Sequence, residues 1–155
     1  MAHFAELESK TDPTGFTSDT HLVVKRVVVV GNDVSTAAGP LGNNNEHVDG
    51  ETWCVNFFGG GTWKQTSYNN NFRKMYAGKG FVYNASKNKF LTPQPYASWS
   101  LDGSDDWQAP VTYPNGDQSA YLISWDEDNL RWVGVKTSDN SNHRWDADNT
   151  EWVSL

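Results

Sequence analysis

The chain has 155 residues, which suits one domain or one domain with a small appended module. It contains 12 Lys and Arg against 19 Asp and Glu, and the resulting net charge of −7 opposes long-range attraction to nucleic acid or to an anionic membrane. Aromatic residues reach 14%, eight of them Trp, so the chain has too much apolar ring area to be disordered.

Targeting signals and disulfides are not expected. The longest apolar run, residues 27–30, is too short to cross a bilayer, and the acidic N-terminus lacks the basic and apolar regions of a signal peptide. Cys54 is the single cysteine, so no internal disulfide can form. We therefore expect a soluble protein that assembles in a reducing cytoplasm.

The first half of the sequence predicts a β-hairpin and then a short helix. Residues 2–8 favour a first strand, and residues 22–30, which are rich in β-branched side chains, give the clearest strand of the chain. The Asp-Pro-Thr-Gly turn at 12–15 lies in a long loop between them. Residues 46–58 begin with acidic side chains and end at three glycines, 59–61, which predicts an amphipathic helix with a glycine C-cap.

Charge divides the chain into three parts. Residues 1–63 carry three basic and eight acidic side chains, residues 64–89 carry six basic and none acidic, and residues 90–155 carry three basic and eleven acidic. The basic band at 64–89 alternates with Tyr and Phe, a combination that single-stranded nucleic-acid sites use. We favour an acidic protein partner or this protein's own acidic hairpins, because the net charge opposes a polyanion.

The second half contains a repeat in which two aromatic residues bracket a turn rich in Asp and Asn. Rings at this spacing meet across a tight hairpin, so each unit predicts a β-hairpin closed by an aromatic clasp. In the last two turns, Asp126 and Asp146 are expected to accept backbone N–H bonds, and Asn129 and Asn149 to adopt the left-handed conformation. The predicted clasps pair Tyr83 with Phe90, Trp99 with Trp107, Trp125 with Trp132 and Trp145 with Trp152.

These elements predict a mainly β fold, in which an N-terminal β-hairpin and one short helix are followed by tandem aromatic-clasped β-hairpins. The expected domains are residues 1–80, which include the basic strand segment, and residues 81–155, which hold the repeats. Because an isolated hairpin is marginal in water, the hairpins are expected to stack on each other, on the N-terminal part or on a partner.

Motifs for catalysis or metal binding are weak. Cys54 and His47 lie seven residues apart on the predicted helix without a third orienting group, and a lone Cys among apolar neighbours is more often a buried hydrophobe. The glycines at 59–61 lack the spacing of a phosphate loop, and the Asp-rich turns lack the glycine and distal Glu of a calcium loop. We expect no catalytic residue, no metal and no cofactor, and hence not an enzyme.

Several blocks of the sequence carry a likeness to a known family. They are the opening Met-Ala-His-Phe-Ala, residues 58–69 (Phe-Gly-Gly-Gly-Thr-Trp-Lys-Gln-Thr-Ser-Tyr-Asn), residues 72–83, residues 93–99 and the Trp-Asp-Glu…Trp hairpins. In these blocks the chain resembles small proteins of marine cyanobacterial phages (cyanophages) that are described as uncharacterised or as virion structural proteins. The resemblance is clearest from 53 to 132. A longer loop at 12–21 and an extra terminal hairpin at 145–152 depart from the family pattern.

The resemblance implies a component of the bacteriophage virion, assembled in the host cytoplasm and without enzymatic residues. With the small acidic chain and its aromatic side chains, it favours a capsid decoration (cement) protein on the outer head surface. The major capsid protein is the expected partner and the copies form a homo-oligomer on the particle; membrane and nucleic acid are not expected partners. The alternative is a tail, baseplate or fibre accessory protein that contacts host surface glycans, since clustered Trp side chains stack on pyranose rings.

The predicted partner-binding residues lie in the basic band, because that band is free of acidic side chains and capsid exteriors are commonly acidic. Charge reversal of Arg73 and Lys74 is expected to abolish attachment and to leave the fold unchanged. The residues expected to face the shell or a neighbouring copy are Lys64, Arg73 and Lys74, with Tyr68 and Tyr76 as aromatic anchors.

Overall fold

The computed structural model describes residues 1–42 and 48–155, and this part of the chain is mainly β, as predicted, with one short helix. It forms two compact units, Met1–Pro93 and Gln94–Leu155, each with its own core. The boundary predicted at residue 80 is therefore displaced. The hairpin that contains Tyr83 and Phe90 belongs to the first unit because its strands join the N-terminal sheet.

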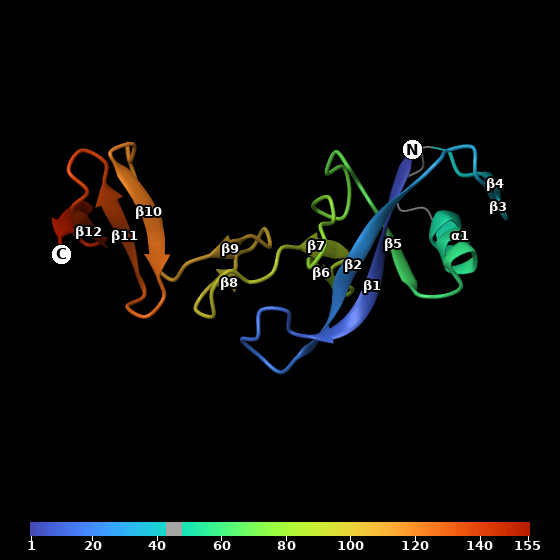
Figure 1. The fold of residues 1–155 in the computed structure, drawn as a ribbon, viewed down its shortest axis with the longest axis horizontal. Helices are drawn as coiled ribbons and strands as arrows, with labels where there is room; N and C mark the ends of the chain where they lie inside the picture. Colours follow the sequence, from blue (N-terminus) through green and yellow to red (C-terminus); the bar gives the residue numbers. More distant parts are fainter. Residues whose placement is uncertain (43–47) are drawn as a thin grey trace. The chain divides into compact units, whose positions relative to one another are not determined.

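The first unit is built on a five-stranded antiparallel sheet with a long central hairpin (Figure 1). The strands expected at 2–8 and 22–30 are present, and each extends further toward the loop that joins them. Asp12 holds that loop, since its carboxylate accepts the backbone N–H groups of Thr14 and Thr17. The sheet order is β5-β1-β2-β6-β7, with β1 (Ala2–Thr11), β2 (Thr20–Val30), β5 (Thr62–Thr66), β6 (Val82–Asn84) and β7 (Lys89–Leu91); a ribbon of β3 (Ser35–Thr36) and β4 (Gly39–Pro40) follows β2.

Both sides of β1 are buried, which explains why its sequence does not alternate between apolar and polar residues. Helix α1 (Val48–Phe58) lies on one side, where Phe4 of the strand and Cys54 of the helix are wholly buried in one cluster. Gly50 permits this close approach, because a Cβ there would lie 2.4 Å from Cζ of Phe4. Ala5 and Leu7, which alternate with Phe4 along β1, enter a second cluster together with Val24, Ala77, Tyr83 and Phe90.

The helix ends as predicted. Gly59 follows it with φ +75°, and the N–H of Gly60 donates to the carbonyl of Val55 at 2.7 Å, so a glycine C-cap closes the last turn. The first two residues of the predicted helix, 46 and 47, lie outside the described residues. In the described part of the chain, no helix has the length and apolar character needed to cross a bilayer.

A β-bulge gathers two cations around one carboxylate on the central hairpin. Glu6 pairs with Arg26 and Leu7 with Val24, which leaves Lys25 as the extra residue. The Lys25 ammonium lies 3.1 Å from the Glu6 carboxylate, which also accepts a hydrogen bond from Arg26. Partial burial raises the pKa of Glu6, but the hydrogen bonds from Arg26 and Lys25 outweigh it and the pKa is lowered.

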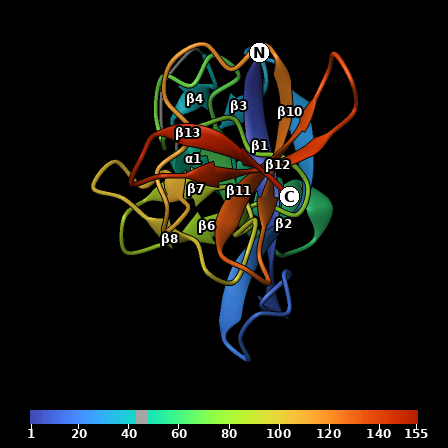
Figure 2. The ribbon, with the colours of Figure 1, turned by 90° about the vertical axis from the view of Figure 1, so that its left-hand side faces the viewer.

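The second unit contains a small ribbon and a four-stranded antiparallel meander, whose strands β12 and β13 are visible in Figure 2. Asp126 and Asp146 accept N–H bonds in the hairpin turns, as expected. The prediction for Asn129 and Asn149 is corrected: Leu130 and Thr150 take the left-handed conformation, with φ of +50° and +55°. The strands are β8 (Ser100–Leu101), β9 (Trp107–Gln108), β10 (Tyr121–Asp126), β11 (Arg131–Lys136), β12 (Asn142–Asp146) and β13 (Glu151–Ser154).

Candidate functional site

The aromatic clasps form core rather than a binding surface. Trp125 lies directly opposite Trp132, and Trp145 opposite Trp152, and the first three of these rings are buried. Their indole nitrogens are used internally: Trp125 donates to Glu127 at 2.7 Å and Trp132 to the carbonyl of Val111 at 2.8 Å. These donors and buried faces hold the second unit together.

The other two predicted clasps differ from each other. Tyr83 and Phe90 lie directly opposite, with ring centroids 5.1 Å apart, but within the first unit. In the remaining hairpin, Trp107 lies opposite Leu101, so Trp99 is outside the paired strands. The ring of Trp99 packs instead with Tyr96, Trp125 and Trp132, because the hairpin has one more residue than its counterparts.

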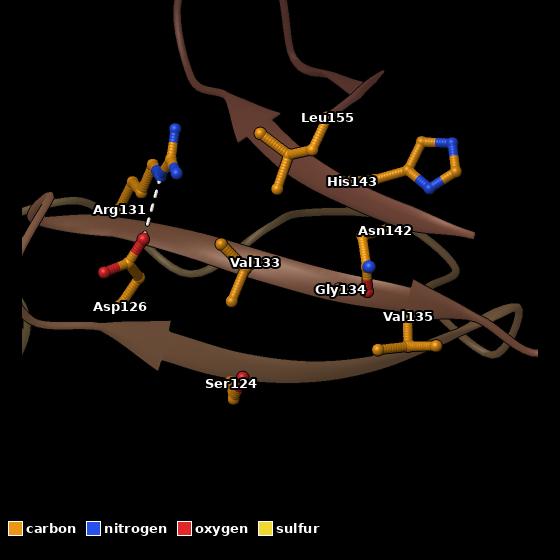
Figure 3. Close-up of a pocket in the computed structure, with 9 residues that line it drawn as sticks. All are labelled: Ser124, Asp126, Arg131, Val133, Gly134, Val135, Asn142, His143 and Leu155. Atoms are coloured by element: carbon orange, nitrogen blue, oxygen red, sulfur yellow. Dashed lines mark hydrogen bonds and ion pairs between the residues drawn. The ribbon is translucent and has the colours of Figure 1, made fainter. Parts of the chain in front are cut away.

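The other face of the β10–β13 sheet carries a shallow hollow of about 390 Å³ (Figure 3). An ion pair between Asp126 and Arg131, at 3.0 Å, lies at one end, and His143 lies at the other. Val133 and Val135 line the hollow between them and are half-exposed. The hollow offers a mixed contact surface without a cluster of converging titratable groups.

Arg73 is buried, which corrects the prediction that it faces a partner. Its side chain is 5% exposed, and Nη1 donates to Glu51 Oε1 at 2.8 Å and to the carbonyl of Gln65 at 2.7 Å. Nε donates to Asn88 at 2.9 Å. Because Arg73 joins α1, β5 and the β6–β7 hairpin, its reversal to Glu would disrupt the fold and not only attachment.

The neighbouring lysines of the basic band lie closer to the surface. Lys64 Nζ is 3.2 Å from Glu51 Oε2, and the side chain of this lysine is 31% exposed. Lys74 is half-exposed and, like Arg73, has a left-handed backbone, with φ of +70° and +54° respectively. Part of the positive charge expected to face a partner is thus neutralised by Glu51 inside the unit.

Tyr68 and Tyr76, the predicted anchors, meet on the surface of the first unit together with His3. The Tyr68 ring stacks on His3, with centroids 5.5 Å apart, and forms a T-shaped pair with Tyr76, with centroids 5.4 Å apart. Burial raises the pKa of Tyr76, and the neighbouring Tyr68 adds to this; burial also lowers the pKa of His3, as does the positive N-terminus. We call His3, Tyr68 and Tyr76 the ring cluster.

A hollow of about 430 Å³ adjoins the ring cluster. Its walls come from Met1 and the start of β1, from Gly42, and from the end of β5 and the turn that follows β5. We call it the Tyr68 hollow; the lining residues that matter below are His3, Ser67, Tyr68, Asn69, Asn71 and Phe72.

An aromatic patch at the end of α1 was not anticipated. Phe57 is 66% exposed and stacks on Trp53 at 4.6 Å, whereas Phe58 stacks on Trp63 at 4.8 Å. The guanidinium of Arg26 lies 4.7 Å from the centre of the Phe58 ring. We call Trp53, Phe57, Phe58 and Trp63 the aromatic patch.

One signal in the sequence points to this patch. Successive residues of a helix lie about 100° apart, so Phe57 and Phe58 cannot both enter a narrow buried stripe. Both residues lie in the last turn of the helix, before three glycines, so one of the two rings has to reach the surface.

The thiol of Cys54 is wholly buried, and burial, together with the negative charge of Glu51, raises its pKa to about 12. His47, which was considered beside it, lies outside the described residues. Among the residues that the structure describes, no group of three His, Cys, Asp or Glu side chains is arranged to hold a metal ion.

Comparison with family models, with curated proteins and with solved structures found no match for this chain.

Proposed function

We propose that the protein is a structural component of a phage particle, a decoration protein that attaches to the outer surface of the capsid by binding and not by catalysis. The phage assignment rests on the resemblance of the sequence blocks described above. The attachment role is supported chiefly by one observation, the exposed Phe57 ring held rigidly within the aromatic patch.

The patch has the composition of a protein–protein hot spot. Phe, Trp and Arg are enriched at the centres of such interfaces, and rings fixed before binding lose little entropy when they dock. Phe57 and Phe58 are fixed by stacking on Trp53 and Trp63, and the Arg26 guanidinium covers Phe58. Two patch residues, Phe58 and Trp63, also belong to the block that carries the phage resemblance.

Reattachment to particles tests the proposal. Purified protein is added to heads that lack it, and bound protein is quantified after sedimentation and imaged by electron microscopy. The wild type is expected to saturate head sites, and Phe57→Ser to bind at least about tenfold more weakly because a hot-spot ring is lost. Phe16→Ser is the matched control, since Phe16 is 41% exposed but lies in the β1–β2 loop, away from the patch in sequence.

If the Phe57→Ser variant binds heads as tightly as the wild type does, the role of the aromatic patch is contradicted. Heads with unchanged surface density, together with an appendage missing from the tail, would contradict decoration and favour the tail, baseplate or fibre alternative.

A further inference from the structure

We propose that the Tyr68 hollow binds a neutral pyranose sugar of a glycan, with Tyr68 as the stacking platform. This site is separate from the aromatic patch and does not rest on the decoration role.

Tyr68 is exposed but rigid. Its residue surface is 67% exposed, and its ring is held by stacking on His3, with 22° between the planes, and by the edge contact with Tyr76. With these two contacts in place, the exposed two thirds of the residue surface remain accessible to a ligand. A pyranose presents C–H groups along one face, and these pack favourably on the electron-rich face of a fixed aromatic ring.

Two carboxamides line the hollow beside this ring. The side chains of Asn69 and Asn71 are exposed and make no hydrogen bond within the described residues. Asn70, between them, is used differently: it has φ +58° and its Oδ1 accepts the N–H of Tyr76 at 2.6 Å. A carboxamide offers a donor and an acceptor together, which matches neighbouring hydroxyl groups on a sugar.

The turn that carries these amides is locked from within. The N–H of Asn71 donates to Ser67 Oγ at 2.9 Å, and the N–H of Asn70 to the Ser67 carbonyl at 3.1 Å. On the next stretch of chain, the N–H of Ala77 donates to Thr66 Oγ1 at 2.8 Å. The ring and the backbone that carries the two amides are therefore held in place before a ligand arrives, which reduces the ordering cost of binding.

The lining of the hollow does not suit a polyanion. Its described lining residues include Met1, which carries the N-terminal ammonium, but no Lys, Arg, Asp or Glu side chain, whereas a nucleotide or nucleic acid needs cations at its successive phosphates. Burial and the positive N-terminus lower the pKa of His3, which disfavours the charged form of its imidazole. The volume of about 430 Å³ lies within the range of small-molecule sites, roughly 300–1,000 Å³.

The experiment is an NMR titration of the ¹⁵N-labelled full chain with the methyl glycosides of glucose, galactose, mannose and N-acetylglucosamine. At least one is expected to bind with a dissociation constant on the order of 1 mM. The shifts should involve the side-chain amides of Asn69 and Asn71 and the backbone of residues 66–72.

Variants of Tyr68 distinguish the loss of ring stacking on the sugar from a general loss of the fold. Tyr68→Ala is expected to weaken binding at least about tenfold, and Tyr68→Phe, which keeps the ring, to retain it. Tyr113→Ala is the control, because Tyr113 is also an exposed tyrosine, at 54%, but lies in the other unit. Unchanged spectra elsewhere in Tyr68→Ala show that the fold is intact.

Three results would overturn the proposal: no residue-specific shift with any of the four glycosides, shifts that persist in Tyr68→Ala, or shifts confined to the second unit. A fourth combination would also overturn it: the wild type binds no glycoside, and the Tyr68→Ala variant no longer attaches to heads. The ring cluster would then contact the capsid shell, as the sequence predicted for Tyr68 and Tyr76. If the protein fails to attach to heads, the decoration proposal is contradicted, but the glycoside titration still tests the sugar site by itself.

Discussion

Arg73 shows how burial changes the meaning of a charged residue. A guanidinium that is 5% exposed and bonded to a carboxylate, a carbonyl and a side-chain amide acts as a structural link and not as a surface contact. Its left-handed backbone, with φ +54°, adds strain that these bonds have to offset.

We expect Arg73→Ala to lower the free energy of unfolding by roughly 3–5 kcal/mol, because it leaves the Glu51 carboxylate buried without its main partner. Lys64→Ala should cost less than about 1 kcal/mol, because Lys64 is partly exposed and screened by water. Urea unfolding followed by Trp fluorescence measures both. Equal losses in the two variants would contradict the structural role of Arg73.

Cys54 gives a second prediction at this scale. Because its thiol is wholly buried and its pKa is raised to about 12, a thiol reagent such as Ellman's reagent is expected to label it only after unfolding. Cys54→Ser should attach to particles normally and lose about 1–2 kcal/mol of stability from a buried hydroxyl. Labelling of the native protein at the rate seen in urea would show that the thiol is accessible.

At the level of elements, local signals were predictable and long-range pairing was not. The two strands of the first hairpin and the helix end follow from β-branched runs and from glycine. The β6–β7 hairpin was also expected, but its attachment to β2 depends on the pairing of Val82 with Val23, 59 positions apart in the printed numbering, which no local pattern reveals.

The candidate site was predicted in part. Tyr68 and Tyr76 meet as surface rings, but His3 joins them only because β1 pairs with β5, where it lies opposite Thr66. Arg73 was expected on the surface because its charge is visible in the sequence, whereas its partner Glu51 comes from a different element. The burial of Arg73 depends on this tertiary contact with Glu51, which the charge pattern of the sequence does not reveal.

Gly134 supports a prediction about the meander. A Cβ added there would lie 2.9 Å from Cη2 of Trp152 and 3.3 Å from Cβ of Tyr121. The rings of these two residues stack on each other, with centroids 4.6 Å apart. Gly134→Ala is therefore expected to destabilise the second unit by about 1–3 kcal/mol through overpacking. Hydrogen exchange of the β10–β13 amides measures this. Gly103→Ala, with nothing within 4 Å, is the control and should leave exchange unchanged.

At the scale of the whole molecule, charge is divided unequally between the units. Met1–Pro93 carries nine basic and eight acidic side chains, and Gln94–Leu155 carries three basic and eleven acidic. In the second unit, hydrogen bonds hold several carboxylates in the charged form. Hydrogen bonds from Ser98 and Trp125 lower the pKa of Glu127. Hydrogen bonds from Asn129 and Arg131 lower the pKa of Asp126.

Acid is therefore expected to destabilise the second unit. A carboxylate with a folded-state pKa below its unfolded value stabilises the fold above the unfolded pKa, and this contribution is lost as pH falls through the folded value. The unfolding temperature should fall between about pH 5 and pH 2, and Glu127→Gln should make the fall shallower. Calorimetry across this range checks the slope; a rise in unfolding temperature would mean that relief of carboxylate repulsion dominates.

The indole rings of the second unit also have an optical consequence. Trp99, Trp125 and Trp132 lie with centroids 5.0–6.2 Å apart, and Trp145 lies 5.4 Å from Trp152. Electronic transitions of indoles this close couple, so circular dichroism should show paired bands of opposite sign that vanish when these rings separate. Trp53 and Trp63 belong to the other unit and contact phenylalanine rings. The unfolding of Gln94–Leu155 can therefore be followed in the intact, unlabelled chain by the loss of this coupling.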